Sequence, residues 1–389
     1  MYFSRRLEQL SANVFADMDK AKAAAVATGQ SLIDLSLGSS DLPASPIAID
    51  AIHKALDDPS THGYVLHRNT QAFREAIATW YTERYGIVVD AATEVLPLIG
   101  SQEGTAHLPL VLMDEDDVAL LPDPGYPSYT GGVALANGKI HYLPLTAENQ
   151  FLPNFDAIPS DILPRTRLMI LSYPHNPTTG IATLDFFTKA VAFCQENDIV
   201  LVHDFPYNDM YFGEVEPPSA LQADPQKSCS IEFFTFSKSF NMGGFRIAFA
   251  VGNAEIIQGL RRLKAVVDFN QYAGTLSGAI AALQQDKDTI TKNVTVYKAR
   301  RDALVDALNK VGWDVPKPDA TLYVWAKLPE SWEGTSIEFC TELVAKTGVA
   351  LSPGSGFGKM GEGYVRFALV QEPEILRNVV QKIDTFLTV

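Results

Sequence analysis

The sequence predicts an α/β protein, with a large domain built on a mostly parallel central sheet and a smaller α/β domain after it. Up to about residue 275, short continuous apolar runs alternate with helical stretches, which is typical of strands covered by helices on both faces. Beyond that point a long helical stretch is followed by short strands and helices. A length of 389 residues also favours two domains over one.

The large domain, predicted at residues 41–275, contains two clear amphipathic helices and six buried strands. Residues 71–84 carry apolar side chains on one helical face, with Thr70 placed to cap the start and Gly86 to end the helix. Residues 184–197 show the same pattern. The predicted strands are the apolar runs 95–99, 118–121, 168–172, 199–203, 231–236 and 247–251.

The small domain, predicted at residues 276–389, opens with a long helical stretch over residues 273–307 that is interrupted near residues 286–288. Its remaining pattern alternates short β-prone runs with amphipathic stretches. The predicted strands are 321–326, 348–351 and 364–368, and the predicted helices are 336–347 and 373–387.

Composition excludes several classes of partner. The net charge of 31 − 46 = −15 disfavours nucleic acid and anionic membrane surfaces. No apolar run approaches the roughly 20 residues of a membrane helix, and the first residues lack an apolar signal segment. The three cysteines indicate a reducing compartment without disulfides, and none has the spacing of metal ligands. We therefore expect a cytoplasmic protein without a metal.

Polar and aromatic residues follow five of the predicted strands. In open α/β sheets, ligands bind beyond the carboxyl ends of the strands, so these residues are expected to converge. Such a convergence is more specific than any single motif. The residues are Gly100, Ser101 and Gln102 after the first strand, Tyr126 after the second, Asn176 after the third, Asp204 and Tyr207 after the fourth, and Ser237 and Lys238 after the fifth.

Lys238 is the most informative of these residues. It follows a buried apolar strand, and its partial desolvation favours the uncharged amine that forms a Schiff base. The hydroxyls of Thr235 and Ser237 and the guanidinium of Arg246 suit a phosphate dianion. An aldehyde that carries a phosphate, such as pyridoxal phosphate (PLP), would use all of these groups.

The chemistry of PLP assigns a role to each of the converging residues. Backbone N–H groups at the helix start by Ser101 and Gln102 suit the phosphate. A buried carboxylate, Asp204, would keep the pyridine nitrogen protonated, so that the ring acts as an electron sink. The remaining predicted roles are Tyr207 and Asn176 as partners of the phenolate oxygen, Tyr126 as the stacking partner of the ring, and Arg366 as the bidentate partner of a substrate carboxylate.

Over nearly its whole length the chain resembles the fold-type I, class I/II PLP-dependent aminotransferases. It is most similar to the LL-diaminopimelate aminotransferase group, in residues 100–108 (GSQEGTAHL), 123–129 (DPGYPSY), 237–246 (SKSFNMGGFR), 320–325 (ATLYVW) and 353–366 (PGSGFGKMGEGYVR). The resemblance implies transfer of an amino group from an amino acid to 2-oxoglutarate or a similar 2-oxo acid, by a ping-pong Schiff-base mechanism.

The resemblance also implies roles that the residues alone do not reveal. Lys238, Asp204 and Tyr207 match the catalytic positions of the family, and Gly38 and Asn176 match positions beside the substrate. Tyr64 resembles a tyrosine that reaches the phosphate of the neighbouring subunit, which implies a homodimer with shared active sites. Residues 1–40 are expected to pack with the small domain.

Two departures bear on the substrate. The diaminopimelate group carries a lysine where this chain has Gln102, which sets diaminopimelate itself in question. The arginine that aspartate aminotransferases use for a side-chain carboxylate is missing from residues 268–272, so aspartate is not expected as the preferred donor.

Other readings stay open from the sequence. A PLP-dependent β-lyase or decarboxylase would use the same cradle and lysine, because the reaction depends on which Cα bond stands perpendicular to the ring. A ligand sensor for transcription lacks a DNA-binding domain here, and a dinucleotide enzyme lacks its G-x-G-x-x-G motif. Asp204 is also suited to a helix cap and Arg246 to a structural ion pair. His203, Tyr323 and Trp325 are expected in the core or, for the histidine, at the surface.

Overall fold

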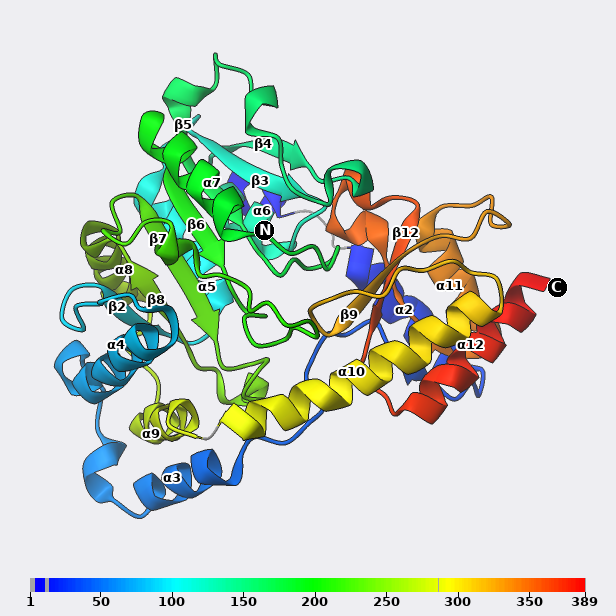
Figure 1. The fold of residues 1–389 in the computed structure, drawn as a ribbon, viewed down its shortest axis with the longest axis horizontal. Coiled ribbons are helices and arrows are strands. Elements are labelled where there is room, and N and C mark those ends of the chain that lie inside the picture. Colours follow the sequence, from blue (N-terminus) through cyan, green and yellow to red (C-terminus); the bar gives the residue numbers. More distant parts are fainter. Residues whose placement is uncertain (1–3, 11–13, 286, 389) are drawn as a thin grey trace.

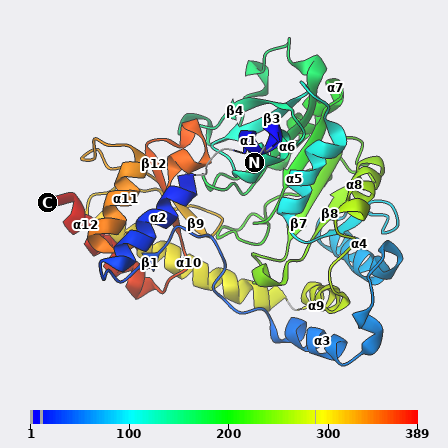
Figure 2. The ribbon, with the colours of Figure 1, turned by 180° about the vertical axis from the view of Figure 1, so that it is seen from behind.

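The computed structural model describes residues 4–10, 14–285 and 287–388. A large body with a central sheet and a smaller body stand side by side, and the long helix α10 (Lys287–Lys310) runs along both (Figures 1 and 2). The predicted α/β architecture is confirmed.

The large body is organised around a seven-stranded sheet with the order β2-β8-β7-β6-β5-β3-β4. Every strand runs parallel to the others except β8, which is antiparallel to both of its neighbours. The strands are β2 (Val95–Leu98), β3 (Val118–Asp123), β4 (Lys139–Pro144), β5 (Thr166–Leu171), β6 (Val200–Asp204), β7 (Ser230–Thr235) and β8 (Ala248–Gly252).

All six predicted strands of the large domain are present, within a few residues of their predicted ends. Strand β4 was not predicted; it lies at the edge of the sheet and pairs only with β3 within the described residues. Because most of its side chains are exposed or half-buried, β4 lacks the continuous apolar run that marks a central strand.

Helices cover both faces of this sheet. Successive residues of β7 alternate between them, so Phe233 packs with α5, α6 and α8 while Phe234 packs with α4 and α9. Helix α7 packs on strands β5 and β6, and their buried side chains form a further core cluster. The helices are α3 (Pro46–Leu56), α4 (Gln71–Tyr85), α5 (Ser101–Leu112), α6 (Ser128–Leu135), α7 (Leu184–Glu196), α8 (Ala254–Val267) and α9 (Ala273–Leu283).

Of the two residues predicted to mark the ends of α4, one acts as predicted and the other does not. Gly86 ends α4 in the left-handed conformation with φ of 69°, as its position predicts. The Thr70 hydroxyl donates to the carbonyl of His67 and accepts from Nε of Arg74, but it accepts no bond from a backbone N–H of the helix, so the predicted side-chain cap is wrong.

The small body has a three-stranded antiparallel sheet with the order β11-β12-β9, covered by helices. Its core also takes in residues of the N-terminal part of the chain. The elements are β9 (Tyr323–Lys327), β10 (Val349–Ala350), β11 (Ser352–Pro353), β12 (Tyr364–Ala368), α11 (Ser336–Thr347) and α12 (Pro373–Thr388).

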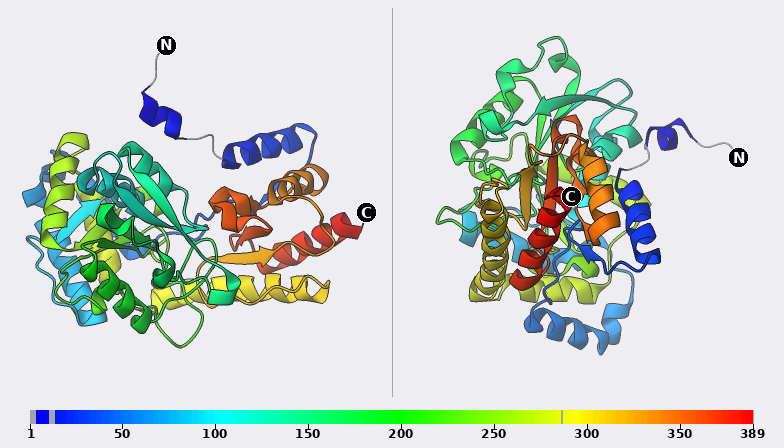
Figure 3. Two further views of the ribbon diagram at one scale, coloured as in Figure 1. Left: turned by 90° about the horizontal axis from the view of Figure 1, so that it is seen from above. Right: turned by 90° about the vertical axis from the view of Figure 1, so that its right-hand side faces the viewer.

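The N-terminal elements are α1 (Arg5–Gln9), α2 (Val14–Ala27) and β1 (Ile33–Asp34). Strand β1 pairs in parallel with β10, and α2 lies beside α11 (Figure 3). Helix α9 packs against α3 and α4, and α10 packs against α12. The predicted interruption near residues 286–288 falls between α9 and α10, where residue 286 lies outside the described residues. The domain boundaries at residues 40 and 275 stay predictions.

Candidate active site

A cavity of about 800 Å³ opens at the carboxyl ends of the parallel strands and is closed on its other side by residues of β9 and β12. Its volume is ample for a cofactor together with a small substrate. All of the predicted site residues except Tyr64 line it, namely Gly38, Ser101, Gln102, Tyr126, Asn176, Asp204, Tyr207, Thr235, Ser237, Lys238, Arg246 and Arg366.

Lys238 stands three residues beyond the end of β7. Its Nζ atom donates a hydrogen bond to the carbonyl of Gly38, and it lies 5.8 Å from the centroid of the Tyr207 ring. The amine is thereby held inside the cavity, within reach of groups from both bodies of the molecule.

Asp204 is the last residue of β6 and is almost completely buried. The Tyr129 hydroxyl donates to its Oδ2 atom at 2.7 Å, but Oδ1 has no hydrogen-bond partner among the residues that the structure describes. Burial raises the pKa of this carboxyl to about 6, and the hydroxyls of Tyr129 and Ser101 and the charge of Lys238 offset only part of that rise. A buried acceptor without a donor fits a protonated pyridine nitrogen.

The start of α5 and Arg246 form a cradle that fits a phosphate. The first backbone N–H groups of a helix are free to bind an anion, and here α5 begins at Ser101. A Cβ atom at Gly100 would lie 2.7 Å from Nη2 of Arg246, so a side chain there would push the guanidinium away from the start of the helix. The Thr235 hydroxyl donates to that of Ser237 at 2.9 Å beside it.

Arg366 lies on β12 and is only 5% exposed. It donates to Oδ1 of Asn176 at 2.7 Å and to the carbonyl of Ser36 at 2.9 Å. Its guanidinium carbon lies 4.1 Å from the centroid of the Tyr323 ring and 4.6 Å from that of Phe357. The side chain is therefore fixed in one orientation, and its Nε atom has no partner in the described part of the chain.

Tyr126 and Gln102 meet on another wall of the cavity, where the Tyr126 hydroxyl donates to Oε1 of Gln102 at 3.4 Å. Burial raises the pKa of the Tyr126 phenol, so it stays protonated at neutral pH. Tyr64 stands apart from the cavity and is 87% exposed, with its ring centroid 6.1 Å from that of Phe269.

Two tyrosines of the site were not predicted from the sequence. Tyr323 was expected in the core, and it is buried, but it also lines the cavity and accepts a hydrogen bond from the Tyr207 hydroxyl at 3.0 Å. Tyr129, the partner of Asp204, was not singled out. A usable signal existed, since a phenol on a core position needs a polar partner nearby.

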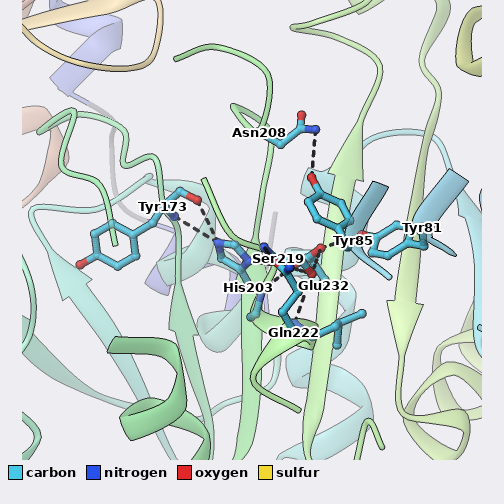
Figure 4. Close-up of polar contacts among 10 residues, drawn as sticks. Tyr81, Tyr85, Tyr173, His203, Asn208, Ser219, Gln222 and Glu232 are labelled. Carbon is cyan, nitrogen blue, oxygen red and sulfur yellow. Dashed lines mark hydrogen bonds and ion pairs between the residues drawn. The ribbon is translucent and has the colours of Figure 1, made fainter. Parts of the chain in front are cut away.

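A buried polar network lies behind the strand ends (Figure 4). Oε2 of Glu232 lies 2.7 Å from Nδ1 of His203, and Oε1 accepts a bond from the Tyr81 hydroxyl at 2.6 Å. Nε2 of His203 contacts the backbone of Tyr173, and Ser219 donates to the same carboxylate. The network joins neighbouring residues of β6 and β7 to the segment after β5. His203 is fully buried, so of its two expected places it takes the core. Among the described residues, no group of histidine, cysteine and acidic side chains has the arrangement of a metal site.

Comparison with known proteins agrees with the geometry. The sequence model of the family "Aminotransferase class I and II" matches residues 30–383. LL-diaminopimelate aminotransferases of Dehalococcoides mccartyi and Aquifex aeolicus are 42% and 38% identical, over 99% and 98% of both chains respectively.

Solved structures give the same picture. Substrate-bound BacF from Bacillus subtilis has a TM-score of 0.95 at 35% identity, with 99% of this chain and 98% of that chain covered. A probable N-succinyldiaminopimelate aminotransferase from Thermus thermophilus has a TM-score of 0.91 at 40% identity, with 96% and 99% covered.

Proposed function

The chain belongs to the class I and II aminotransferases, which use pyridoxal phosphate, and we propose that it transfers an amino group from a diamino dicarboxylic acid resembling LL-diaminopimelate to 2-oxoglutarate or a similar 2-oxo acid. The observation that carries the substrate class is full-length identity of about 40% to several LL-diaminopimelate aminotransferases. The exchange follows ping-pong kinetics, because one cavity serves the donor and then the acceptor.

The cavity residues fit the cofactor in three places. Oδ1 of Asp204 offers a buried acceptor to the pyridine nitrogen, and the α5 start with Arg246 offers the phosphate cradle. Lys238 supplies the amine that holds the aldehyde. When bound, pyridoxal phosphate supplies an electron sink that makes the bonds at the substrate Cα labile. The other residues that would hold it are Ser101, Gln102, Tyr126, Asn176, Tyr207, Thr235 and Ser237, with Tyr64 from a second subunit.

Lys238 moves the proton in this proposal. Its Nζ atom, freed by the substrate, takes the α-proton as a general base and returns it as a general acid. The carbonyl of Gly38 accepts a hydrogen bond from Nζ and so keeps the amine inside the cavity between these steps.

Arg366 orients the substrate. Its two terminal nitrogens lie in a fork suited to a carboxylate, and the bonds to Asn176 and to the Ser36 carbonyl hold the fork in place. A substrate carboxylate anchored there turns one Cα bond towards Lys238. Arg366 thereby raises the reaction rate by orienting the substrate rather than by stabilising charge.

The first test is the visible absorption spectrum of the loaded protein with a panel of amino acids. LL-diaminopimelate, glutamate, lysine and aspartate separate the donor classes. The proposal expects LL-diaminopimelate to bleach the band and 2-oxoglutarate to restore it. Bleaching by glutamate alone would refute the diamino acid as donor, and Gln102→Lys is the matched variant, since that position departs from the diaminopimelate group.

Product analysis separates amino transfer from a β-lyase or decarboxylase, which the comparisons do not favour. Release of ammonia or carbon dioxide without a 2-oxo acid would contradict amino transfer. Absence of any band after incubation with pyridoxal phosphate would overturn the cofactor assignment as well.

We also propose that the protein is a homodimer of the cytoplasm. Tyr64, Val266, Val267 and Phe269 are large apolar or aromatic side chains that are more than half exposed, which is typical of an interface surface. Light scattering is expected to give the mass of two chains, and Tyr64→Ala to weaken cofactor binding. A fully active monomer would contradict this.

The three cysteines form no disulfide in the described structure, which suits a reducing compartment. Between residues 4 and 388, apart from the gaps in the description, no helix has the length and apolarity to cross a membrane. Cell fractionation tests the cytoplasmic assignment.

A further inference from the structure

Tyr323 connects three of the predicted site residues, although its sequence pattern indicates only a core position. Its hydroxyl accepts a hydrogen bond from Tyr207 at 3.0 Å, and it donates to the Gly38 carbonyl, the acceptor of the Lys238 amine, at 3.5 Å. Its ring lies against the guanidinium of Arg366, 4.1 Å away. One side chain therefore contacts both the proton-transfer side and the carboxylate side of the cavity.

We infer that Tyr323 is a positioning residue with two separable roles: its ring orients Arg366 for the substrate carboxylate, and its hydroxyl controls the proton that Tyr207 offers to the cofactor. This inference rests on the proposed function and goes beyond it by assigning a residue that the family resemblance leaves without a role.

The first role follows from geometry. A guanidinium over an aromatic face is attracted by the ring quadrupole, and the attraction is strongest where both groups are buried, as they are here. Tyr323 and Phe357 hold the flat faces of Arg366, while Asn176 and Ser36 hold its edge. Arg366 also lines the cavity, so these contacts fix the orientation in which its guanidinium meets a substrate carboxylate.

The second role follows from the pairing of the two hydroxyls. Burial raises the pKa of the Tyr207 phenol. Burial alone would also raise the pKa of Tyr323, but the positive charges of Lys238 and Arg366 and the bond from Tyr207 bring it below its ordinary value. Tyr323 is thus the stronger acid of the pair.

When an anionic oxygen of the cofactor faces Tyr207, the direction of the pair reverses. Tyr323 then donates to Tyr207, and Tyr207 donates to the anion. A phenol that accepts a hydrogen bond is a better donor, because bonds in a chain polarise one another. The hydroxyl of Tyr323 therefore strengthens the donor that stabilises the cofactor oxygen.

Gly38 leaves the space that the Tyr323 hydroxyl occupies. A Cβ atom at position 38 would collide with the Tyr323 hydroxyl, so a side chain there would displace the phenol from Tyr207. Glycine at this position is explained by the packing of Tyr323, independently of any contact with the substrate.

The experiment compares Tyr323→Phe, which removes only the hydroxyl, with Tyr323→Leu and Tyr323→Met, which remove the ring. Tyr297→Phe is the matched control, because it deletes another buried hydroxyl, bonded to Ser40 at 2.8 Å, from a residue that does not line the cavity. Two quantities are measured, namely the affinity of the cofactor-free protein for glutarate, by calorimetry, and the pH midpoint of the visible band of the loaded protein.

The two roles give different patterns. In Tyr323→Phe, the midpoint is expected to rise by about 0.4 to 1 pH unit, the equivalent of one neutral hydrogen bond, with glutarate affinity within about twofold of wild type. In Tyr323→Leu and Tyr323→Met, glutarate affinity is expected to fall by about 5- to 30-fold, as for a buried cation–π contact. Tyr297→Phe should change neither quantity.

An unchanged midpoint in Tyr323→Phe overturns the hydroxyl role, and undiminished glutarate affinity in the ring-free variants overturns the ring role. The double variant Tyr207→Phe with Tyr323→Phe should show the same midpoint as Tyr207→Phe alone, and additive shifts would also contradict the inference. Failure of the proposed function is a separate result, because it appears as a wild-type protein without a band or without amino transfer.

Discussion

Asp204 is expected to destabilise the cofactor-free protein, so that Asp204→Asn stabilises it while disabling the enzyme. The carboxyl is buried, and its Oδ1 atom has no partner among the described residues. Asparagine keeps the shape and an acceptor for the Tyr129 hydroxyl, but it carries no charge. The substitution therefore isolates the free energy of one buried charge.

The magnitude follows from the pKa. Burial raises the pKa of Asp204 from 3.8 to about 6, a difference of roughly 2 units, which corresponds to about 3 kcal/mol of unfolding free energy. An unpaired amide group in the variant would cost about 1 kcal/mol, which leaves a net gain of about 2 kcal/mol.

The pKa shift of Asp204 also determines how the unfolding free energy changes with pH. Because the pKa of the folded state lies above that of the unfolded state, the folded protein binds more protons between pH 3.8 and about 6. The contribution of the Asp204 carboxyl to the unfolding free energy is fully present below pH 3.8 and is lost as the pH rises through about 6. The advantage of Asp204→Asn should therefore grow from pH 4.5 to pH 6.5 and stay constant above that.

The assay is urea unfolding of the cofactor-free proteins at several pH values, with Asp224→Asn as the control of opposite sign. Burial alone would raise the pKa of Asp224, but hydrogen bonds from the backbone of Ser228 and Cys229 bring it below its ordinary value. Its contribution to stability is present above pH 3.8 and lost at lower pH, so its amide variant should be less stable at pH 8. An Asp204→Asn protein no more stable than wild type at pH 8 would refute the reasoning, as would a gap independent of pH.

Three further predictions concern single side chains. Lys238→Ala should lower the rate of amino transfer by about 10³-fold or more, measured by single-turnover absorbance against the exposed-site control Lys189→Ala, and a loss below tenfold would exclude a proton-transfer role. Arg366→Lys should raise KM for both substrates about 10- to 100-fold with a smaller change in kcat, because a bidentate fork becomes a single point charge; unchanged KM in steady-state kinetics would contradict this. Glu232→Leu should cost about 3 to 5 kcal/mol in urea unfolding, because it leaves His203 and its other partners unpaired, and a loss below about 1 kcal/mol would show that the network is dispensable.

Much of the site could be predicted because its residues directly follow apolar runs that are recognisable in the sequence. A buried parallel strand appears as an uninterrupted apolar run, and the next residues lie at the edge where ligands bind. Asn176, Asp204 and Lys238 each follow such a run, and all three line one cavity. The sheet brings them together without any pairwise signal in the sequence.

Other parts depend on contacts between distant segments. Strand β4 is held by pairing with β3 and carries mostly exposed or half-buried side chains. It therefore lacks the apolar run from which a strand could be predicted. Tyr323 occupies a regular inward position of β9, and only the approach of Gly38 and Tyr207 turns its hydroxyl into part of the site. Such residues are invisible to periodicity, because the pattern of a strand records burial but not what the buried group meets.

Two buried carboxylates, Glu232 on β7 and Asp204 on β6, show how a structural acidic group differs from one that binds a ligand. Glu232 accepts bonds from Tyr81, from Ser219 and from the backbone of Ala220, and it contacts His203, so its charge is balanced within the fold. Asp204 lies on the strand beside it and is equally removed from water, yet one of its oxygens meets no donor in the described chain. Native proteins rarely leave a buried charge half-satisfied, because the cost is several kcal/mol. The imbalance at Asp204 persists because a cationic group from outside the chain completes it, and that is the strongest physical argument for a cofactor in this cavity.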